Sequence, residues 1–348
     1  MSFSNKILKI KKYDIPSKIF FAPINPGYSY NGTIDDRYTE FFIKRAGNGI
    51  GICYIGNVAI DTDLRTNEGT AVLLKEQEKE WMYLTNEIRS KGSIPGIQLA
   101  WKPVNINMQR NFFCEEKNQF LKIAQKYYEE FVEYDFIVKR FVDKIEFAKS
   151  VGFDLVQIHA AHGYALSLLL SQYVSRVSSP RENKGYKIIE QIINLCKTQN
   201  LIFDIRISLY EGWEAPEKEL EYKETLFKLL LELGVDMISL SNGFYNLDKN
   251  MIYPPKLFGP VLLKDAIYIA HKYPNMVWNV AGNMEQIDFE DIPENLSISI
   301  GRQLLVDPLF ITKVQNGTKE EIIKCTECNR CHYYSNMLPG IIECNVFK

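Results

Sequence analysis

The sequence predicts an α/β protein, a (β/α)8 or TIM barrel followed by a short cysteine-rich extension at the carboxyl end. Short apolar runs of strand length alternate with amphipathic helical patterns along most of the 348 residues. The runs are nearly continuous rather than alternating, which is typical of strands covered on both faces. The units are evenly spaced and no early G-x-G-x-x-G motif is present, so an open doubly wound sheet is less consistent with the sequence.

Eight apolar runs follow one another, and together they can close one barrel. The predicted strands cover residues 18–23, 51–57, 94–100, 155–161, 202–208, 237–243, 276–282 and 296–302. The helical patterns between them cover residues 35–45, 76–90, 134–150, 187–199, 218–233 and 260–271. In the pattern at 134–150, Phe141 and Ile145 belong to one apolar stripe, and Gly152 follows as a C-cap. We expect the barrel to occupy residues 1–316 and the extension residues 317–348.

The composition excludes several classes of function. Hydrophobic residues make up 46% of the chain, and 41 basic residues nearly balance 43 acidic ones. Without a basic field, neither a nucleic acid nor an anionic membrane is an expected partner. No apolar stretch approaches the roughly 20 residues of a spanning helix, and the amino terminus lacks a signal-peptide core. We therefore expect a cytoplasmic protein that acts on a small molecule.

Polar and aromatic side chains gather at the ends of the predicted strands, where a TIM barrel carries its active site. The fourth strand ends in HAAHGY, which places His159, His162 and Tyr164 at the mouth, and Gly163 releases the backbone into a loop. Two of the chain's four histidines lie beside a tyrosine here, which favours a catalytic role over a structural one. Earlier strand ends contribute Ala22, Pro23, Ile24, Asn25, Asn57, Gln98 and Trp101.

The later strands carry features that indicate an anionic ligand. Arg206 lies inside the apolar run IFDIRIS, where a buried guanidinium needs a negative partner. That partner is either a carboxylate of the chain, Asp204 or another, in a salt bridge, or a bound anion. The last two strands end in Gly282-Asn283 and Gly301-Arg302. Small residues there let backbone N–H groups approach a phosphate, and the arginine can neutralise it.

Four of the seven cysteines crowd the carboxyl end with the spacing C-x₂-C-x₂-C-x₁₂-C: Cys325, Cys328, Cys331 and Cys344. In a reducing compartment such crowding indicates a metal site rather than disulfides. A triple C-x₂-C-x₂-C run is typical of [4Fe–4S] ligation, whereas structural zinc sites usually use two separated pairs. An iron–sulfur cluster is favoured, with zinc and unligated thiols as the alternatives. Cys53, Cys114 and Cys196 are expected to be buried apolar residues.

Taken together, the motifs resemble the old yellow enzyme family of FMN-dependent oxidoreductases. The resemblance rests on FAPIN near the start, IQLA in the third strand, HAAHGY in the fourth, IRIS in the fifth and IGRQLLVDP at the eighth, over most of residues 15–315. The carboxy-terminal cysteines are similar to those of the branch that contains 2,4-dienoyl-CoA reductase and trimethylamine dehydrogenase, whose barrels carry an iron–sulfur cluster after the last strand.

This resemblance implies an ene-reductase with FMN at the barrel mouth and NAD(P)H as electron donor. Hydride would pass from the reduced flavin to the activated C=C bond of an enone, enal or enoyl thioester. By similarity, Tyr164 is the proton donor, while His159 and His162 bind the substrate's carbonyl oxygen. The residues expected at the flavin ring are Ala22, Pro23, Ile24, Asn25, Asn57, Gln98 and Arg206, and those expected at the phosphate are Gly282, Asn283, Gly301 and Arg302.

The sequence also departs from the iron–sulfur branch. Larger members continue past the cluster into flavin- and nucleotide-binding domains, whereas this chain ends at Lys348. Either NAD(P)H reduces the FMN directly, or an electron-donor protein feeds the cluster. Two other functions stay open: an amine dehydrogenase with Trp101, Tyr28 and Tyr30 as an aromatic cage, and a non-catalytic electron-transfer or scaffold subunit. The sequence leaves the substrate and a homo-oligomeric state open.

Overall fold

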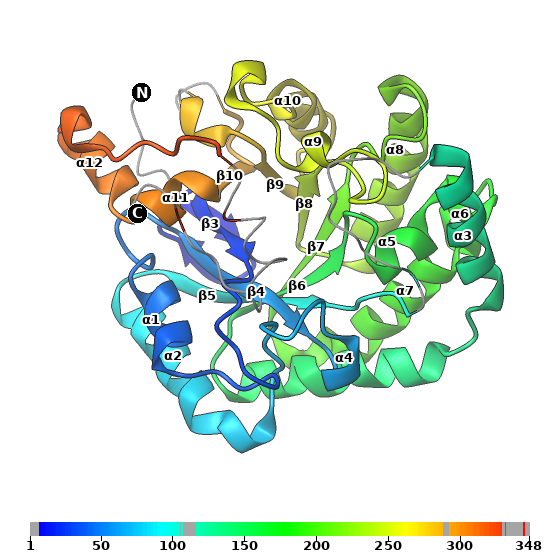
Figure 1. The fold of residues 1–348 in the computed structure, drawn as a ribbon, viewed down its shortest axis with the longest axis horizontal. Helices are drawn as coiled ribbons and strands as arrows, with labels where there is room; N and C mark the ends of the chain where they lie inside the picture. The colour runs from blue at the N-terminus through cyan, green and yellow to red at the C-terminus, as the bar shows by residue number, and fades with distance from the viewer. Residues whose placement is uncertain are drawn as a thin grey trace.

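The protein folds into a closed barrel of eight parallel strands (Figure 1). The computed structural model describes residues 7–104, 106, 116–287, 292–328, 331 and 344. The barrel strands are β3 (Ile19–Ile24), β4 (Ile52–Ala59), β5 (Ile94–Ala100), β6 (Leu155–Ala160), β7 (Ile202–Ser208), β8 (Met237–Ser241), β9 (Val277–Ala281) and β10 (Leu296–Ile300). β10 pairs with β3 and thereby closes the ring. The predicted fold class is confirmed, and each predicted strand lies within two residues of its observed bounds.

Helices surround the barrel and cover its outer face (Figure 1). All six predicted helices are present: α1 (Asp36–Ile43), α2 (Glu78–Ser90), α4 (Tyr134–Ser150), α7 (Lys184–Cys196), α8 (Pro216–Leu233) and α10 (Leu263–Lys272). The side chain of Asp35 caps the first of them, and Gly234, at φ +88°, ends α8 in the left-handed conformation. Helices that were not predicted are α3 (Lys117–Glu130), α5 (Ala165–Leu170), α6 (Gln172–Ser175), α9 (Lys249–Ile252), α11 (Arg302–Val306) and α12 (Phe310–Asn316).

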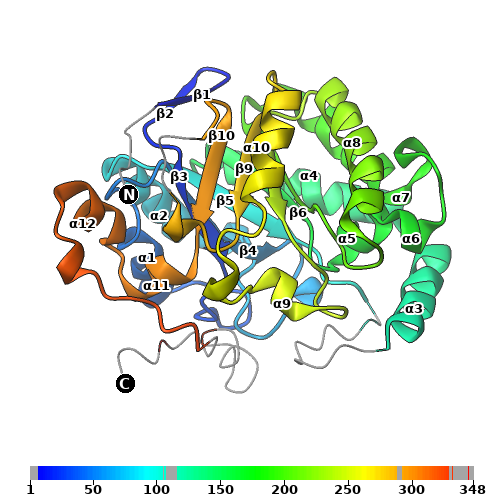
Figure 2. The same ribbon diagram turned by 90° about the horizontal axis from the view of Figure 1, so that it is seen from above.

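An amino-terminal hairpin closes the end of the barrel at which the strands begin. Its antiparallel strands are β1 (Leu8–Ile10) and β2 (Tyr13–Ile15), and Figure 2 shows them beyond the starts of β3 and β10. Apolar hairpin side chains pack against inward-facing residues from the strand starts. This layer consists of Leu8, Ile10, Ile15, Phe20, Ile52, Tyr54, Leu155, Ile202 and Met237, all buried. It forms an apolar floor beneath the barrel interior.

Two irregularities in strand register lie at the opposite end, the mouth. One falls between Phe21 and Ile24 in β3, the other between Ile55 and Val58 in β4. Such bulges re-aim side chains next to active sites. Gly56 lies in the second bulge at φ +156°, where an added Cβ would meet the Gln98 Cβ at 2.8 Å. Glycine is therefore needed at the position that precedes Asn57.

The first residues of the extension lie against α11. Gln303 donates from Nε2 to the Ile323 carbonyl at 2.8 Å and accepts at Oε1 from the Cys325 N–H at 3.1 Å. The Ile323 N–H donates to Asp307 Oδ2 at 3.0 Å. These bonds fix the chain between α12 and Cys325 beside the barrel mouth.

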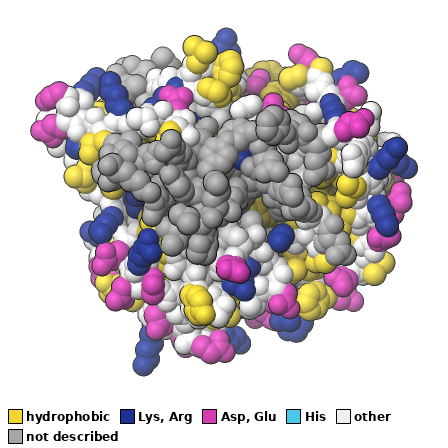
Figure 3. Space-filling model, in the orientation of Figure 1, with side chains coloured by type: hydrophobic (Ala, Val, Ile, Leu, Met, Phe, Trp, Pro, Cys, Tyr) yellow, Lys and Arg dark blue, Asp and Glu magenta, His cyan; other side chains and the backbone are white. Residues whose placement is uncertain are grey.

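Charged side chains of both signs are interspersed on the face shown in Figure 3. This agrees with the near balance of basic and acidic residues in the sequence. Within the part of the chain that the structure describes, no helix combines the length and apolarity needed to cross a membrane.

Candidate active site

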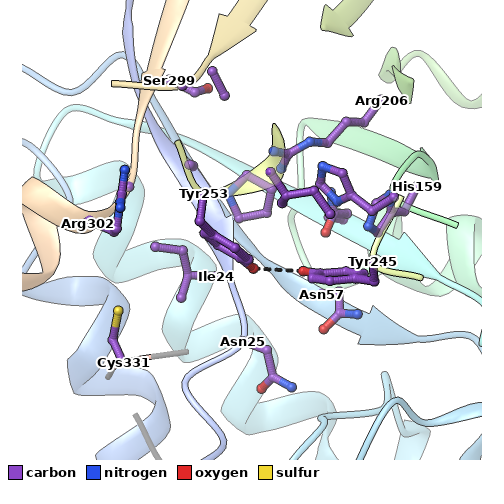
Figure 4. A pocket seen from close by; sticks show the side chains of 18 of the residues that line it. Ile24, Asn25, Asn57, His159, Arg206, Tyr245, Tyr253, Ser299, Arg302 and Cys331 are labelled. Carbon is purple, nitrogen blue, oxygen red and sulfur yellow. Dashed lines mark hydrogen bonds between the residues drawn. The ribbon is translucent and has the colours of Figure 1, made fainter. Parts of the chain in front are cut away.

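A pocket opens at the barrel mouth, where the predicted site residues come together (Figure 4). Of the barrel residues predicted to act on substrate or cofactor, all but Asn283 line it: Ala22, Pro23, Ile24, Asn25, Asn57, Gln98, His159, His162, Tyr164, Arg206, Gly282, Gly301 and Arg302. Trp101, Tyr28 and Tyr30, the suggested aromatic cage, are not among the lining residues. Trp101 packs on Phe131 instead, and Tyr30 is 78% exposed.

His159, His162 and Tyr164 form one aromatic group on the β6 side of the pocket. The rings of His159 and Tyr164 have centroids 4.3 Å apart, and those of the two histidines 5.2 Å. His162 at φ +63° and Gly163 at φ +80° turn the chain sharply, so that Tyr164 returns towards His159. This turn explains why three polar rings from one hexapeptide share a small volume.

The Tyr164 hydroxyl is buried and held in place from β4. Asn57 donates from Nδ2 to the Tyr164 hydroxyl oxygen at 2.9 Å, and the Thr66 hydroxyl lies 3.4 Å away. Tyr164 is only 2% exposed. Because the amide donates, the tyrosine keeps its own proton for another acceptor. Asn57 therefore positions the hydroxyl as a donor.

A serine on β8 connects Arg206 with His162. Arg206 donates from Nη2 to Ser241 Oγ at 3.1 Å, and that oxygen lies 2.6 Å from His162 Nε2. A guanidinium can only donate, so Ser241 Oγ accepts from Arg206 and keeps one hydrogen and one further lone pair, either of which suits His162 Nε2. Ser241 was not singled out in the sequence, where it reads as an ordinary strand residue.

Arg206 has unused hydrogen-bonding capacity at the pocket. Burial lowers the pKa of its guanidinium, while the nearby Tyr245, Tyr253 and Asp204 act in the opposite direction. Its Nε is buried without a hydrogen-bond partner among the described residues. Asp204, the suggested salt-bridge partner, accepts hydrogen bonds from Tyr54, Ser239 and Gln157. A buried cation with an open donor at the pocket fits the alternative prediction, an anionic ligand.

Arg302 and the glycines that end β9 and β10 form the other side of the pocket. An added Cβ at Gly282 would meet only the Val261 side chain, at 3.6 Å, and at Gly301 the nearest atom would lie 3.5 Å away. Backbone at these two positions is therefore open to a ligand. Arg302 donates from Nη2 to Asn283 Oδ1 at 2.6 Å and to the Pro254 carbonyl at 2.9 Å.

The side chain of Asn283 has a different task from the other predicted residues. Its Nδ2 lies 3.2 Å from the Pro254 carbonyl, 3.0 Å from that of Pro255 and 3.2 Å from that of Gly259. It thus ties the loop after β8 to Arg302. A phosphate contact from Asn283 would have to come from its backbone N–H.

Two further tyrosines, not singled out in the sequence, come from the loop after β8. Tyr245 and Tyr253 line the pocket, and their hydroxyl oxygens lie 2.7 Å apart (Figure 4). The Tyr245 ring lies 5.7 Å from that of His162 and 6.3 Å from that of Tyr164. Tyr245 could have been predicted from the sequence, because it follows closely after the Asn-Gly pair at the end of a barrel strand, where active-site residues lie.

The four carboxy-terminal cysteines line a second, smaller pocket with Arg302, Leu305 and Val306. Burial, with a smaller contribution from the other three thiols and against the charge of Arg302, raises the pKa of the Cys331 thiol to about 12. Within the described ranges, no three His, Cys, Asp or Glu side chains are close enough to hold a single metal ion. Cys53 and Cys196 are buried as predicted, and Cys114 lies outside the described residues.

Cys331 belongs to both pockets. It lines the main pocket at the barrel mouth and the smaller cysteine pocket, and Figure 4 shows it on the same side as Arg302 and Ile24. Arg302 and Leu305 are also common to the two. These three side chains therefore lie between the barrel mouth and the cysteine pocket.

Residues 6–321 match the model of the NADH:flavin oxidoreductase / NADH oxidase family. The NADH oxidase of Thermoanaerobacter brockii is 25% identical over 333 residues, which cover 86% of this chain and 48% of that protein. The NADPH dehydrogenase of Bacillus subtilis is 24% identical over 334 residues, covering 90% and 95%.

Among solved structures, a complex of 2-naphthoyl-CoA reductase superposes with a TM-score of 0.79 at 17% identity, covering 98% of this chain and 56% of that one. This likeness shows a shared fold. The chain spans about half the length of the NADH oxidase and of the reductase.

Proposed function

Because this chain belongs to the NADH:flavin oxidoreductase / NADH oxidase family, we propose that it is an FMN-dependent ene-reductase. FMN would be bound at the barrel mouth and would supply hydride to the β-carbon of an activated C=C bond. The substrate would be an enone, enal or enoyl thioester. NAD(P)H would provide the two electrons, either directly or through a protein partner.

The observation that carries the FMN assignment is the unpartnered Nε of Arg206. The atom is buried beside the pocket and has no acceptor among the described residues. A flavin ring gains negative charge on reduction, and Arg206 would stabilise that charge. Arg302, at the opposite side of the pocket, together with the open backbone at Gly282 and Gly301, suits a phosphate. Both ends of the pocket thus fit one elongated anionic cofactor.

The aromatic group would provide the remaining steps of alkene reduction. When hydride reaches the β-carbon, negative charge develops on the carbonyl oxygen, and imidazole N–H groups of His159 and His162 would bind that oxygen. Tyr164 would donate its proton to the α-carbon, which completes the saturated product and leaves a phenolate to be reprotonated. Asn57 favours this role because its amide donates to the Tyr164 oxygen.

The extension, residues 317–348, is proposed to bind a [4Fe–4S] cluster beside the FMN barrel of residues 1–316. Support comes from four thiols around one pocket, with the expected spacing in the sequence. A single zinc ion, with bonds of about 2.3 Å, would need its four sulfurs within about 4 Å of one another. The four irons of a cubane cluster accept thiolates at wider separations. The cysteine set therefore suits the cluster better than zinc.

An anaerobic absorption spectrum, followed by titration with NADH and NADPH, tests the cofactors. We expect flavin bands above a broad iron–sulfur shoulder, with the flavin bleached by one of the nucleotides. Flavin that neither nucleotide reduces would indicate a protein donor. Protein that stays colourless after reconstitution with FMN, iron and sulfide would contradict the proposal.

Tyr164→Phe tests the reaction. We expect alkene reduction to fall by about 10²–10⁴-fold, while FMN affinity and flavin reduction by NAD(P)H stay unchanged. Tyr222→Phe is a matched control, because that buried hydroxyl also accepts from an amide, Asn183 Nδ2 at 3.3 Å, and lies away from the pocket. An unchanged rate in Tyr164→Phe would rule out its role as proton donor.

A further inference from the structure

A belt of polar side chains crosses the barrel interior between the apolar floor and the mouth. In the strand register Gln98 on β5 pairs with Gln157 on β6, which pairs with Asp204 on β7. Ser239 on β8 pairs with Asn279 on β9, one level nearer the mouth. All five are buried, with exposures of 3% or less. Polar side chains at this depth are as a rule hydrogen-bonded, and of these five only Asp204 has a buried atom, Oδ1, without a partner among the described residues. The bonds that are made therefore have defined directions.

Asp204 is the acceptor towards which this belt is oriented. Its Oδ2 accepts from the Tyr54 hydroxyl at 2.6 Å, from the Ser239 hydroxyl at 2.8 Å and from Gln157 Nε2. An ionised carboxylate can only accept, so Gln157 must turn its NH₂ group towards β7. The second hydrogen of that NH₂ group points to Ser239 Oγ, 3.0 Å away.

The orientation of the Gln157 amide determines the orientation of the Gln98 amide. With its NH₂ group used, Gln157 has its Oε1 facing β5, where it accepts from Gln98 Nε2 at 2.6 Å. Turning either amide over would set oxygen against oxygen or NH₂ against NH₂ between two side chains that are at most 2% exposed. Gln98 lines the pocket at the mouth. Its Oε1 is therefore left as an acceptor for a ligand, together with the second hydrogen of Nε2.

We propose that Asp204 is a positioning residue for the flavin site: acting through Gln157, it holds the Gln98 amide with its oxygen towards the pocket, as the acceptor for a ring N–H. The proposal rests on FMN binding at the mouth. Oxidised flavin carries a single ring N–H, at N3, between two carbonyl groups. A glutamine that presented its NH₂ group to N3 would place one hydrogen-bond donor against another, the N3–H.

The test follows the N3 imino proton of FMN labelled with ¹⁵N at N3, bound to the full chain, by ¹⁵N-edited proton NMR. In the wild type we expect a resolved imino signal, protected from exchange with water. Gln157→Leu removes the hydrogen bonds that connect Asp204 with Gln98. We expect it to broaden the imino signal beyond detection and to weaken FMN binding about five- to tenfold. Asp204→Asn, which keeps an acceptor oxygen at the same place, should retain the signal.

Asn279→Leu is the matched control. Asn279 belongs to the same belt and bonds to Ser239 and Ser299, but has no bond to Gln157. The Asn279→Leu variant should therefore keep the imino signal protected from exchange, even if the variant protein is less stable than the wild type. If Gln157→Leu does not fold, Gln157→Met, which has a longer and more flexible side chain, carries the same expectation.

Three results would overturn the inference: a protected signal in Gln157→Leu or Gln157→Met, loss of the signal in Asp204→Asn or Asn279→Leu, or no protected imino proton in wild-type protein that binds FMN. The last result would leave the proposed function standing. Wild-type protein that binds no FMN would instead contradict the proposed function itself.

Discussion

Asp204 makes the stability of the protein depend on pH in a direction opposite to that of most carboxylates. Complete burial raises its pKa from 3.8 to about 6, although Tyr54, Gln157 and Ser239 oppose the shift with hydrogen bonds. A carboxyl group with a higher pKa in the folded state binds its proton more tightly there. Its contribution to stability is present in full below pH 3.8 and is lost as pH rises through about 6.

The size of the effect follows from the shift. About two pK units at about 1.4 kcal/mol each correspond to about 3 kcal/mol. Asp204→Asn cannot titrate, so the free energy of unfolding of the variant minus that of the wild type should rise by about 3 kcal/mol between pH 4 and pH 8. For a chain of this length that equals about 4 °C in Tm. The contributions of the other titrating groups to the free energy of unfolding are the same in both proteins and cancel in this difference.

The assay is urea unfolding, followed by tryptophan fluorescence, of wild type and variant at pH values from 4 to 8. Asp143→Asn is the control, since Asp143 lies on the surface in an i,i+4 pair with Lys139, and we expect it to change little. A difference between Asp204→Asn and wild type that stays constant over this range would refute the assigned burial and titration of Asp204.

Three further outcomes are expected. Lys223→Met leaves Glu211, its partner at 2.5 Å, charged and buried, so differential scanning calorimetry should record a loss of about 3–5 kcal/mol, or about 4–7 °C in Tm. Gly51→Ala places a Cβ 2.0 Å from the Ser17 carbonyl oxygen, so the soluble yield should fall and the Tm drop. Arg302→Leu should weaken FMN binding at least tenfold in fluorescence titration with an unchanged circular dichroism spectrum, and undiminished affinity would exclude Arg302 as a phosphate ligand.

The parts of the fold that the sequence predicts are those with strong local signals. The barrel strands are long apolar runs, and α4 has a clear apolar stripe, so its bounds agree with the prediction to the residue. The hairpin of β1 and β2 was missed because three-residue strands in a lysine-rich segment have no periodicity that separates them from a loop. Their burial depends on a barrel end built from residues far along the chain.

For the candidate site, the sequence predicts which residues lie at the mouth but not how their side chains are oriented. Strand ends place side chains at the mouth, so position along the chain was enough to bring His159 and Arg206 into one pocket. The direction in which a side chain points depends on neighbours that are distant in sequence. Asn283 illustrates this, because carbonyl groups of the loop after β8 take up its amide. The relay from Asp204 to Gln98 is likewise visible only once three strands stand side by side.

The amino-terminal hairpin leaves the mouth as the open end of the barrel interior. Because Leu8, Ile10 and Ile15 close the end where the strands begin, the described residues leave water and protons a route to Asp204 from the mouth. A ligand seated there would act as a lid over the polar belt. Proton exchange with Asp204 would then be limited by departure of that ligand, so the carboxyl group would keep the protonation state it had when the mouth was filled.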